Sequence, residues 1–242
     1  MQVSPIGIIW DVSGVIVDAE PRHRWKLTKI ARENGADITP DDWTEYHGKG
    51  DHYIGQRLRE KFQNFSLNEA DFIAACNALY ISPLGELKAR PGATQTIKAL
   101  AARGIPQMVL TNDNASVLNY NLAAADLRPD HFTHVLDSHS LGDIPRKPHR
   151  DAFAHAADKM LQLPQLKHLN GDRGRIIMVE DSPANIVGAH NAGLRTIQWL
   201  LDESMGIPLD PLADWSLQPD ESPYRLISSL TRRTRTGPVL AQ

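Results

Sequence analysis

The chain has 242 residues, a formal net charge of −3 at pH 7, and 41% hydrophobic and 23% charged residues. This composition is typical of a globular protein with a buried core, and the length suggests one large domain or a core with a smaller insertion. The small net charge offers no general attraction for nucleic acid or for an anionic membrane surface.

The single cysteine, Cys76, excludes an internal disulfide framework and favours a reducing compartment. No apolar run approaches the ~20 residues of a membrane span. The first residues also lack the basic and long apolar segments of a secretory signal. We therefore expect a cytoplasmic protein with neither a membrane nor a nucleic acid as its partner.

Apolar strand patterns recur along the chain and alternate with helical patterns from about residue 90 to residue 200. Most of these strands are apolar on both faces, as expected where helices cover both sides of a sheet. The predicted strands cover 6–10, 106–111, 133–137, 175–180 and 195–200. The alternation predicts an α/β fold with a doubly wound, parallel, Rossmann-like sheet.

Residues 19–88 interrupt this alternation, because they carry helical patterns alone. Thr39 before Pro40 is typical of a helix start, for example. We predict an inserted helical cap domain over 19–88, and an α/β core made of 1–18 and 89–201. The remaining residues, 202–242, are rich in Pro, Ser and Asp and then basic, and we expect an irregular C-terminal extension.

The stretch 6–18 organises the rest of the chain. Its apolar run stops abruptly at Asp11, and Gly14 follows three residues later. This pattern indicates a buried strand that ends on a carboxylate and is followed by a tight turn. Ligands of open α/β sheets bind outside the carboxyl ends of the strands, so Asp11 is a candidate nucleophile. The alternative is that Asp11 only caps a loop.

Three further polar clusters follow later strands of the predicted sheet. They are Thr111-Asn112-Asp113, Lys147, and Glu180-Asp181-Ser182. Acidic groups around one site repel each other unless a cation lies among them, and oxygen ligands without His or Cys favour Mg²⁺. A phosphoryl group would complete the charge balance. Each cluster alone is common in turns and helix starts, so the prediction depends on their joint order and placement.

With these four clusters in this order, the chain resembles the haloacid dehalogenase superfamily over about residues 5–200. The resemblance is to its helical-capped branch of phosphatases and phosphomutases, such as β-phosphoglucomutases and phosphoglycolate phosphatases. It implies that Asp11 is the nucleophile, that Lys147 is the motif lysine, and that a small phosphorylated metabolite is hydrolysed through an aspartyl-phosphate. The residues implied to bind phosphate are Ser13, Gly14, Thr111, Asn112 and Lys147. The implied Mg²⁺ ligands are Asp11, the backbone carbonyl of Ser13, Glu180 and Asp181.

Position 13 departs from the family pattern. Phosphatases and mutases of this family carry a second aspartate two residues after the nucleophile, where it protonates the leaving group and later activates water. Ser13 stands there, and serine is no general acid near neutral pH. Losing such a group typically costs about 10²–10⁴ in rate.

Three interpretations follow, in order of preference. In the first, the protein is still a phosphohydrolase, with a good leaving group or with an acid from the cap; the candidates are His47, Asp51 and His52. In the second, it is similar to the phosphonoacetaldehyde hydrolases of the family, with Lys49 as the cap lysine that forms a Schiff base. In the third, it has lost catalysis and binds a phosphorylated ligand or a protein.

Overall fold

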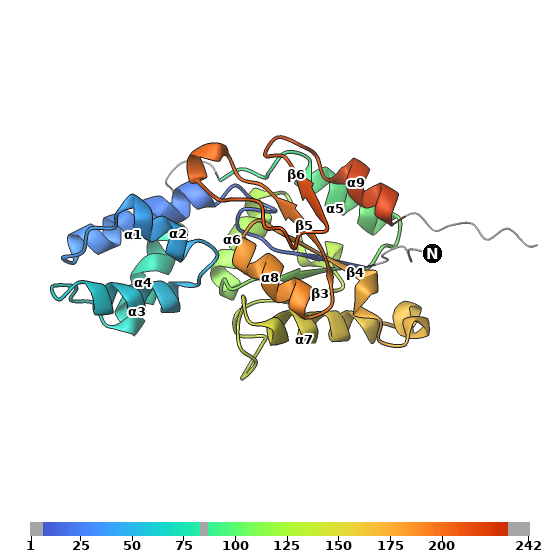
Figure 1. The fold of residues 1–242 in the computed structure, drawn as a ribbon, viewed down its shortest axis with the longest axis horizontal. Coiled ribbons are helices and arrows are strands. Elements are labelled where there is room, and N and C mark those ends of the chain that lie inside the picture. Colours follow the sequence, from blue (N-terminus) through green and yellow to red (C-terminus); the bar gives the residue numbers. More distant parts are fainter. Residues whose placement is uncertain (1–6, 83–86, 232–242) are drawn as a thin grey trace, which may run out of the picture.

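A computed structural model of the chain describes residues 7–82 and 87–231, and all statements below concern these residues. Six strands form one parallel sheet in the order β3-β2-β1-β4-β5-β6 (Figure 1). The strands are β1 (Gly7–Trp10), β2 (Gln107–Leu110), β3 (His134–Leu136), β4 (Ile176–Glu180), β5 (Arg195–Trp199) and β6 (Trp215–Leu217). The predicted α/β class and parallel sheet are confirmed.

Helices cover both faces of the sheet, which explains the two-sided apolar strands. Successive strand residues point to opposite faces. Ile8 and Trp10 of β1 therefore pack with the apolar side chains of α5 (Ala93–Ala102), α6 (Ala115–Ala124) and α9 (Tyr224–Leu230). Ile9 between them packs with α7 (Arg150–Leu161) and α8 (Pro183–Asn191) on the other face.

Four helices lie between β1 and α5, beside the sheet and with an apolar core of their own (Figure 1). They are α1 (Glu20–Glu33), α2 (Pro40–Tyr46), α3 (Asp51–Lys61) and α4 (Glu69–Tyr80). We call residues 19–88 the cap. Thr39 precedes α2 in a capping box with Asp42, as the sequence predicts for this helix start. No helix of the described residues is long and apolar enough to cross a membrane.

The prediction of an irregular C-terminal extension is wrong for two segments. β6 pairs in parallel with β5 and adds an edge strand to the sheet, and α9 packs on α5. Leu217 of β6 and Ile227 of α9 are both buried in the core on that face. A strand of three residues is too short to show an alternation of apolar and polar residues in the sequence. The extended conformation of β6 instead depends on its pairing with β5. Residues 232–242 of the predicted extension lie outside the described residues.

The loop after β1 is fixed in place by a buried arginine at the exit of the cap. Arg90 donates hydrogen bonds to the backbone carbonyls of Gly14 (2.6 Å) and Leu200 (2.7 Å), and its guanidinium lies over the Trp199 ring at 4.3 Å. Burial lowers the pKa of Arg90 to about 10, so the group stays charged at neutral pH. Arg90 therefore holds the turn that follows Asp11 against β5.

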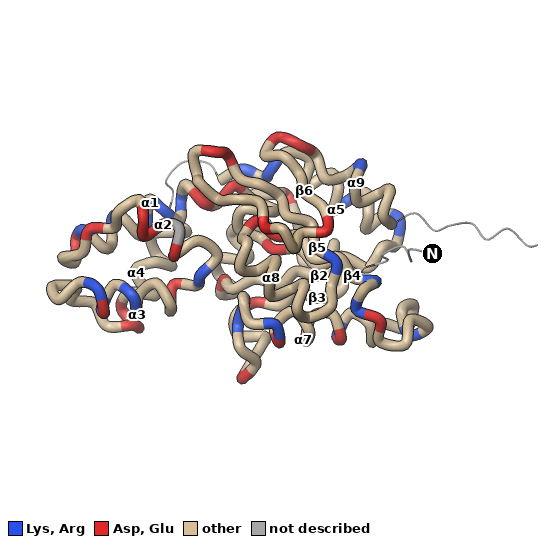
Figure 2. The backbone as a smooth tube through the Cα atoms, in the orientation of Figure 1, with Lys and Arg blue, Asp and Glu red and all other residues tan. Residues whose placement is uncertain are grey.

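Charged side chains of both signs are mixed along the cap and the core (Figure 2). This mixture agrees with the small net charge of −3.

Candidate active site

A buried lysine joins two strand-end carboxylates at the carboxyl edge of the sheet. Asp11 follows β1, Glu180 ends β4, and Lys147 comes from the loop after β3. Lys147 Nζ lies 2.6 Å from Asp11 Oδ1 and 2.5 Å from Glu180 Oε1, and all three side chains are buried. The predicted residues Asp11 and Glu180 thus meet because parallel strands end on the same edge, and the loop after β3 brings Lys147 between them.

The protonation of this trio depends on burial and on mutual charge. Burial, and then the negative charge of Glu180, raises the pKa of Asp11 to about 7, although Lys147 opposes the shift. Burial would lower the pKa of Lys147, but the two carboxylates outweigh it and raise that pKa above its ordinary value. The lysine is therefore a fixed cation beside a carboxylate that titrates near neutral pH.

One carboxylate oxygen from each of Asp11, Glu180 and Asp181 lies within 4.8 Å of the other two. The Glu180 oxygens already have partners, since they also accept hydrogen bonds from Asn185 Nδ2 (2.9 Å) and the backbone N–H of Asp181 (3.1 Å). Asp181 Oδ2, in contrast, is buried and accepts no hydrogen bond from any described residue. Burial raises the pKa of Asp181 to about 6. An oxygen-only cluster with one unsatisfied buried oxygen fits a hard divalent cation such as Mg²⁺.

Gly14 allows the backbone to approach this cluster. Its φ is +84°, a conformation that side chains disfavour. A Cβ atom at this position would lie 1.9 Å from Asp181 Oδ2. The glycine after the nucleophile is therefore required both by the turn and by the nearby carboxylate.

The loop after β2 adds polar groups beside the lysine. Asn112 Nδ2 donates a 2.9 Å hydrogen bond to the backbone carbonyl of Lys147, and Thr111 is buried next to it. Thr111 Oγ1 donates to Asp113 Oδ2 at 3.2 Å, and Ser13 Oγ donates to the same oxygen at 3.1 Å. The predicted residues Ser13, Thr111 and Asn112 thus lie around one site, with Asp113 as an additional member.

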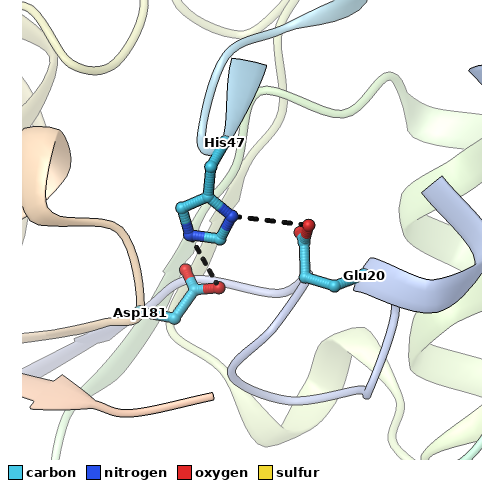
Figure 3. Close-up of side chains that lie close together, drawn as sticks. All are labelled: Glu20, His47 and Asp181. Carbon is cyan, nitrogen blue, oxygen red and sulfur yellow. Dashed lines mark ion pairs between the residues drawn. The ribbon is translucent and has the colours of Figure 1, made fainter. Parts of the chain in front are cut away.

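Of the predicted cap residues, His47 comes closest to the acidic cluster. Its Nδ1 lies 3.4 Å from Glu20 Oε2 and its Nε2 lies 3.6 Å from Asp181 Oδ2, so the ring stands between the two carboxylates (Figure 3). Burial would lower the pKa of His47, but the carboxylates outweigh burial and raise it to about 9. His47 therefore connects the cap to the core as an imidazolium ion.

The other three predicted cap residues line the same cavity but have partners within the cap. Asp51 Oδ2 lies 2.8 Å from the buried Lys26 Nζ. The Lys49 ammonium lies 5.4 Å from the centre of the Tyr53 ring. The half-exposed His52 pairs with the exposed Glu69 on the cap surface.

Three residues of α1 near the site were missed by the sequence analysis: Glu20, His23 and Lys26. Glu20 and His23 in the first turn of a helix resemble ordinary surface residues, and no spacing distinguished them. Lys26 did carry a signal, because a charged residue adjoins the apolar positions Leu27 and Ile30 of this helix.

Cap and core together enclose a cavity of about 610 Å³. Asp11 and Lys147 line it from the core, and His47, Lys49 and Trp43 line it from the cap. Small-molecule sites typically have about 300–1,000 Å³. The nucleophile candidate therefore faces a space that suits a small metabolite.

The family model for haloacid dehalogenase-like hydrolases matches residues 7–193. The chain belongs to this family. The matched range includes Asp11, Thr111, Lys147 and Glu180, and the predicted membership of the superfamily is confirmed.

Solved structures of similar fold come from several members of the superfamily. CbbY from Rhodobacter sphaeroides, in complex with xylulose-(1,5)bisphosphate, has 22% sequence identity and a TM-score of 0.72, covering 88% of this chain and 93% of that one. The β-phosphoglucomutase from Clostridium difficile has 20% identity and a TM-score of 0.71, covering 94% and 97%. At these identities the likeness shows the fold alone.

A curated protein also matches part of the chain. It is Protein SUPPRESSOR OF QUENCHING 1, chloroplastic, from Arabidopsis thaliana, with 23% identity over 194 residues. The match covers 78% of this chain but only 17% of the plant protein, so the chain spans a small part of the length of this relative.

Proposed function

We propose that the protein is a Mg²⁺-dependent hydrolase that removes phosphate from a small phosphorylated metabolite through an aspartyl-phosphate on Asp11. One observation carries the proposal: Lys147 holds the Asp11 carboxylate at the floor of a cavity that the cap covers. Membership in the haloacid dehalogenase-like hydrolases supports the reaction class.

In this proposal each residue of the site has a separate role. The Asp11 carboxylate attacks phosphorus, and Lys147 fixes its orientation and offsets its charge. The Thr111 hydroxyl and the Asn112 amide bind the phosphoryl oxygens. Water then cleaves the acyl-phosphate and regenerates Asp11, so that one difficult displacement becomes two easier ones.

The metal ligands in this proposal are Asp11, the Ser13 backbone carbonyl, Glu180 and Asp181. A Mg²⁺ ion bound by them supplies positive charge to the phosphoryl group. Asp181 Oδ2 supports this assignment because it is buried and accepts no hydrogen bond from any described residue, with the His47 ring 3.6 Å away as its ion-pair partner. The cap contributes by excluding bulk water from the cavity.

The proposed substrate is a phosphorylated sugar or a molecule of similar size. The cavity of about 610 Å³ supports a small metabolite, and the Rhodobacter sphaeroides structure holds a sugar bisphosphate on the same fold. Neither nucleic acid nor a membrane is a partner in this proposal. A cytoplasmic location is part of it, and the single buried Cys76 supports that location.

The test measures phosphate release from a panel of sugar phosphates, sugar bisphosphates, phosphoglycolate and phosphonoacetaldehyde, with Mg²⁺ and with EDTA. Asp11→Asn is the test variant, and Asp18→Asn is the matched control because Asp18 is exposed in the same segment. We expect turnover that needs Mg²⁺, disappears in Asp11→Asn and persists in Asp18→Asn.

Turnover that persists in Asp11→Asn would overturn the proposal. If the folded protein releases phosphate from none of these compounds, the result would favour a binding protein instead. Release from phosphonoacetaldehyde that Lys49→Arg abolishes would favour the Schiff-base reaction, because arginine keeps the charge but forms no imine.

A further inference from the structure

Position 13 carries no carboxylate, but a carboxylate from another loop lies within hydrogen-bond distance of its side chain. Ser13 Oγ donates a 3.1 Å hydrogen bond to Asp113 Oδ2. Asp113 follows β2, whereas Ser13 follows β1, and the two are separated by 100 residues in the sequence. Both side chains line the cavity that contains Asp11.

We propose that Asp113, acting through the Ser13 hydroxyl, is the proton acceptor for hydrolysis of the aspartyl-phosphate. The inference rests on the proposed function and adds a positioning residue to it. In this proposal the Asp113 carboxylate replaces the one missing from position 13, and the Ser13 hydroxyl, 3.1 Å from it, passes the proton on.

The surroundings of Asp113 hold its carboxylate toward Ser13. Asp113 Oδ2 accepts hydrogen bonds from Thr111 Oγ1 (3.2 Å) and Asn121 Nδ2 (3.4 Å) as well as from Ser13. Its backbone N–H donates to Thr111 Oγ1 at 3.1 Å, and its backbone carbonyl accepts from the Ser138 N–H at 2.9 Å. These contacts fix the position of the Asp113 carboxylate beside Ser13 Oγ.

The cap completes the enclosure of the Ser13 hydroxyl. His23 Nε2 of α1 lies 3.3 Å from Ser13 Oγ, and the His23 ring packs on Tyr80 with the ring centres 4.7 Å apart. The Tyr80 hydroxyl donates a 2.8 Å hydrogen bond to Asn121 Oδ1, which orients the amide toward Asp113. The pair of Ser13 and Asp113 is thus the centre of a polar network between cap and core.

The proton balance of the step is complete within the site. The oxygen of water forms a bond to phosphorus, and the bond between phosphorus and the Asp11 oxygen breaks with its electron pair returning to the carboxylate. The proton of the water passes to Ser13 Oγ while the Ser13 proton passes to Asp113 Oδ2. Asp113 then releases its proton to solvent with the product phosphate.

The experiment uses para-nitrophenyl phosphate with Mg²⁺, because nitrophenol release reports phosphorylation of Asp11 and phosphate release reports hydrolysis. In the wild type we expect both products at the same rate. In Ser13→Ala and in Asp113→Asn we expect a burst of nitrophenol near one per site, followed by a steady rate about 10²-fold lower or less. Such a burst separates a hydrolytic defect from a general structural defect.

A second variant moves the carboxylate back to position 13. We expect Ser13→Asp/Asp113→Asn to recover a steady rate within about tenfold of the wild type, whereas Asp113→Asn alone stays slow. The control is Asp143→Asn, an exposed residue on the loop before Lys147, which we expect to behave as the wild type. Thermal unfolding of each variant verifies that it is folded.

Three outcomes would overturn the inference. One is a rate within twofold of the wild type in Asp113→Asn. Another is an equal fall of nitrophenol and phosphate release without a burst in both single variants, which indicates a structural role. The third is a double variant no faster than Asp113→Asn. If nitrophenol release by the wild type still disappears in Asp11→Asn, the proposed function survives any of these results; absence of turnover in the wild type would overturn both.

Discussion

Replacing His47 by glutamine tests whether an imidazolium ion joins the cap to the core. The His47 side chain is 4% exposed and lies between Glu20 and Asp181. The carboxylates raise its pKa from 6.5 to about 9 against the effect of burial. Since one pKa unit corresponds to about 1.4 kcal/mol, the charged form stabilises the fold by about 3 kcal/mol.

The direction of the pH dependence follows from the raised pKa. The folded protein binds the His47 proton more tightly than the unfolded chain, so the contribution is complete below pH 6.5 and is lost as the pH rises through about 9. We therefore expect His47→Gln to be about 3 kcal/mol less stable than the wild type at pH 6, with a difference that shrinks toward zero by pH 10.

Urea unfolding at pH 6, 7.5 and 10 measures this difference. EDTA is included because a cation on Asp181 would compete with the imidazolium. His52→Gln is the matched control: this histidine is half exposed and pairs with an exposed glutamate, so we expect a change below about 1 kcal/mol. A His47→Gln deficit that stays constant from pH 6 to pH 10 would refute the reasoning.

Three further predictions concern the metal site and the cap core. Because Asp11 has a raised pKa of about 7 and Asp181 one of about 6, we expect the apparent Kd for Mg²⁺ to rise about tenfold from pH 7 to pH 6 and more steeply below pH 6. A Kd that calorimetry finds constant from pH 5.5 to 7.5 would contradict this. Gly14→Ala places a Cβ 1.9 Å from Asp181 Oδ2. We therefore expect Mg²⁺ affinity, measured by calorimetry, to fall at least about tenfold. We expect the free energy of unfolding, measured with urea, to fall by about 1–3 kcal/mol. Burial raises the pKa of the Cys76 thiol, so we expect it to react with a disulfide reagent only after unfolding, and rapid labelling of native protein would be inconsistent with its position.

The strands of the sheet could be predicted because burial on both faces leaves a local signal. The run 6–10 became β1, Gly7–Trp10, and the run 195–200 became β5, Arg195–Trp199. β6 left no comparable signal. Its Leu217 is buried because β5 and α9 cover it, and that depends on residues far away in the sequence.

The core half of the site was predictable for a topological reason. Asp11 follows β1 and Glu180 ends β4, so parallel strands bring these two carboxylates to one edge. Lys147 lies further along the loop after β3, and that loop brings it between them. The cap half depends on how two separate apolar cores pack against each other. No sequence pattern could therefore show that His47 would meet Asp181, or that His23 would meet Ser13.

The first helix of the cap, α1, supplies three side chains to the cavity. Glu20, His23 and Lys26 are spaced three residues apart, which places them along one helix face, and all three line the cavity. Glu20 contacts His47 beside the acidic cluster, and His23 contacts Ser13 beside Asp113. A rotation of α1 away from the sheet would break the contact between His23 and Ser13 while it moves the Glu20 partner of His47. A single helix thus carries residues to both parts of the cavity, Glu20 to the acidic cluster and His23 to the pair of Ser13 and Asp113.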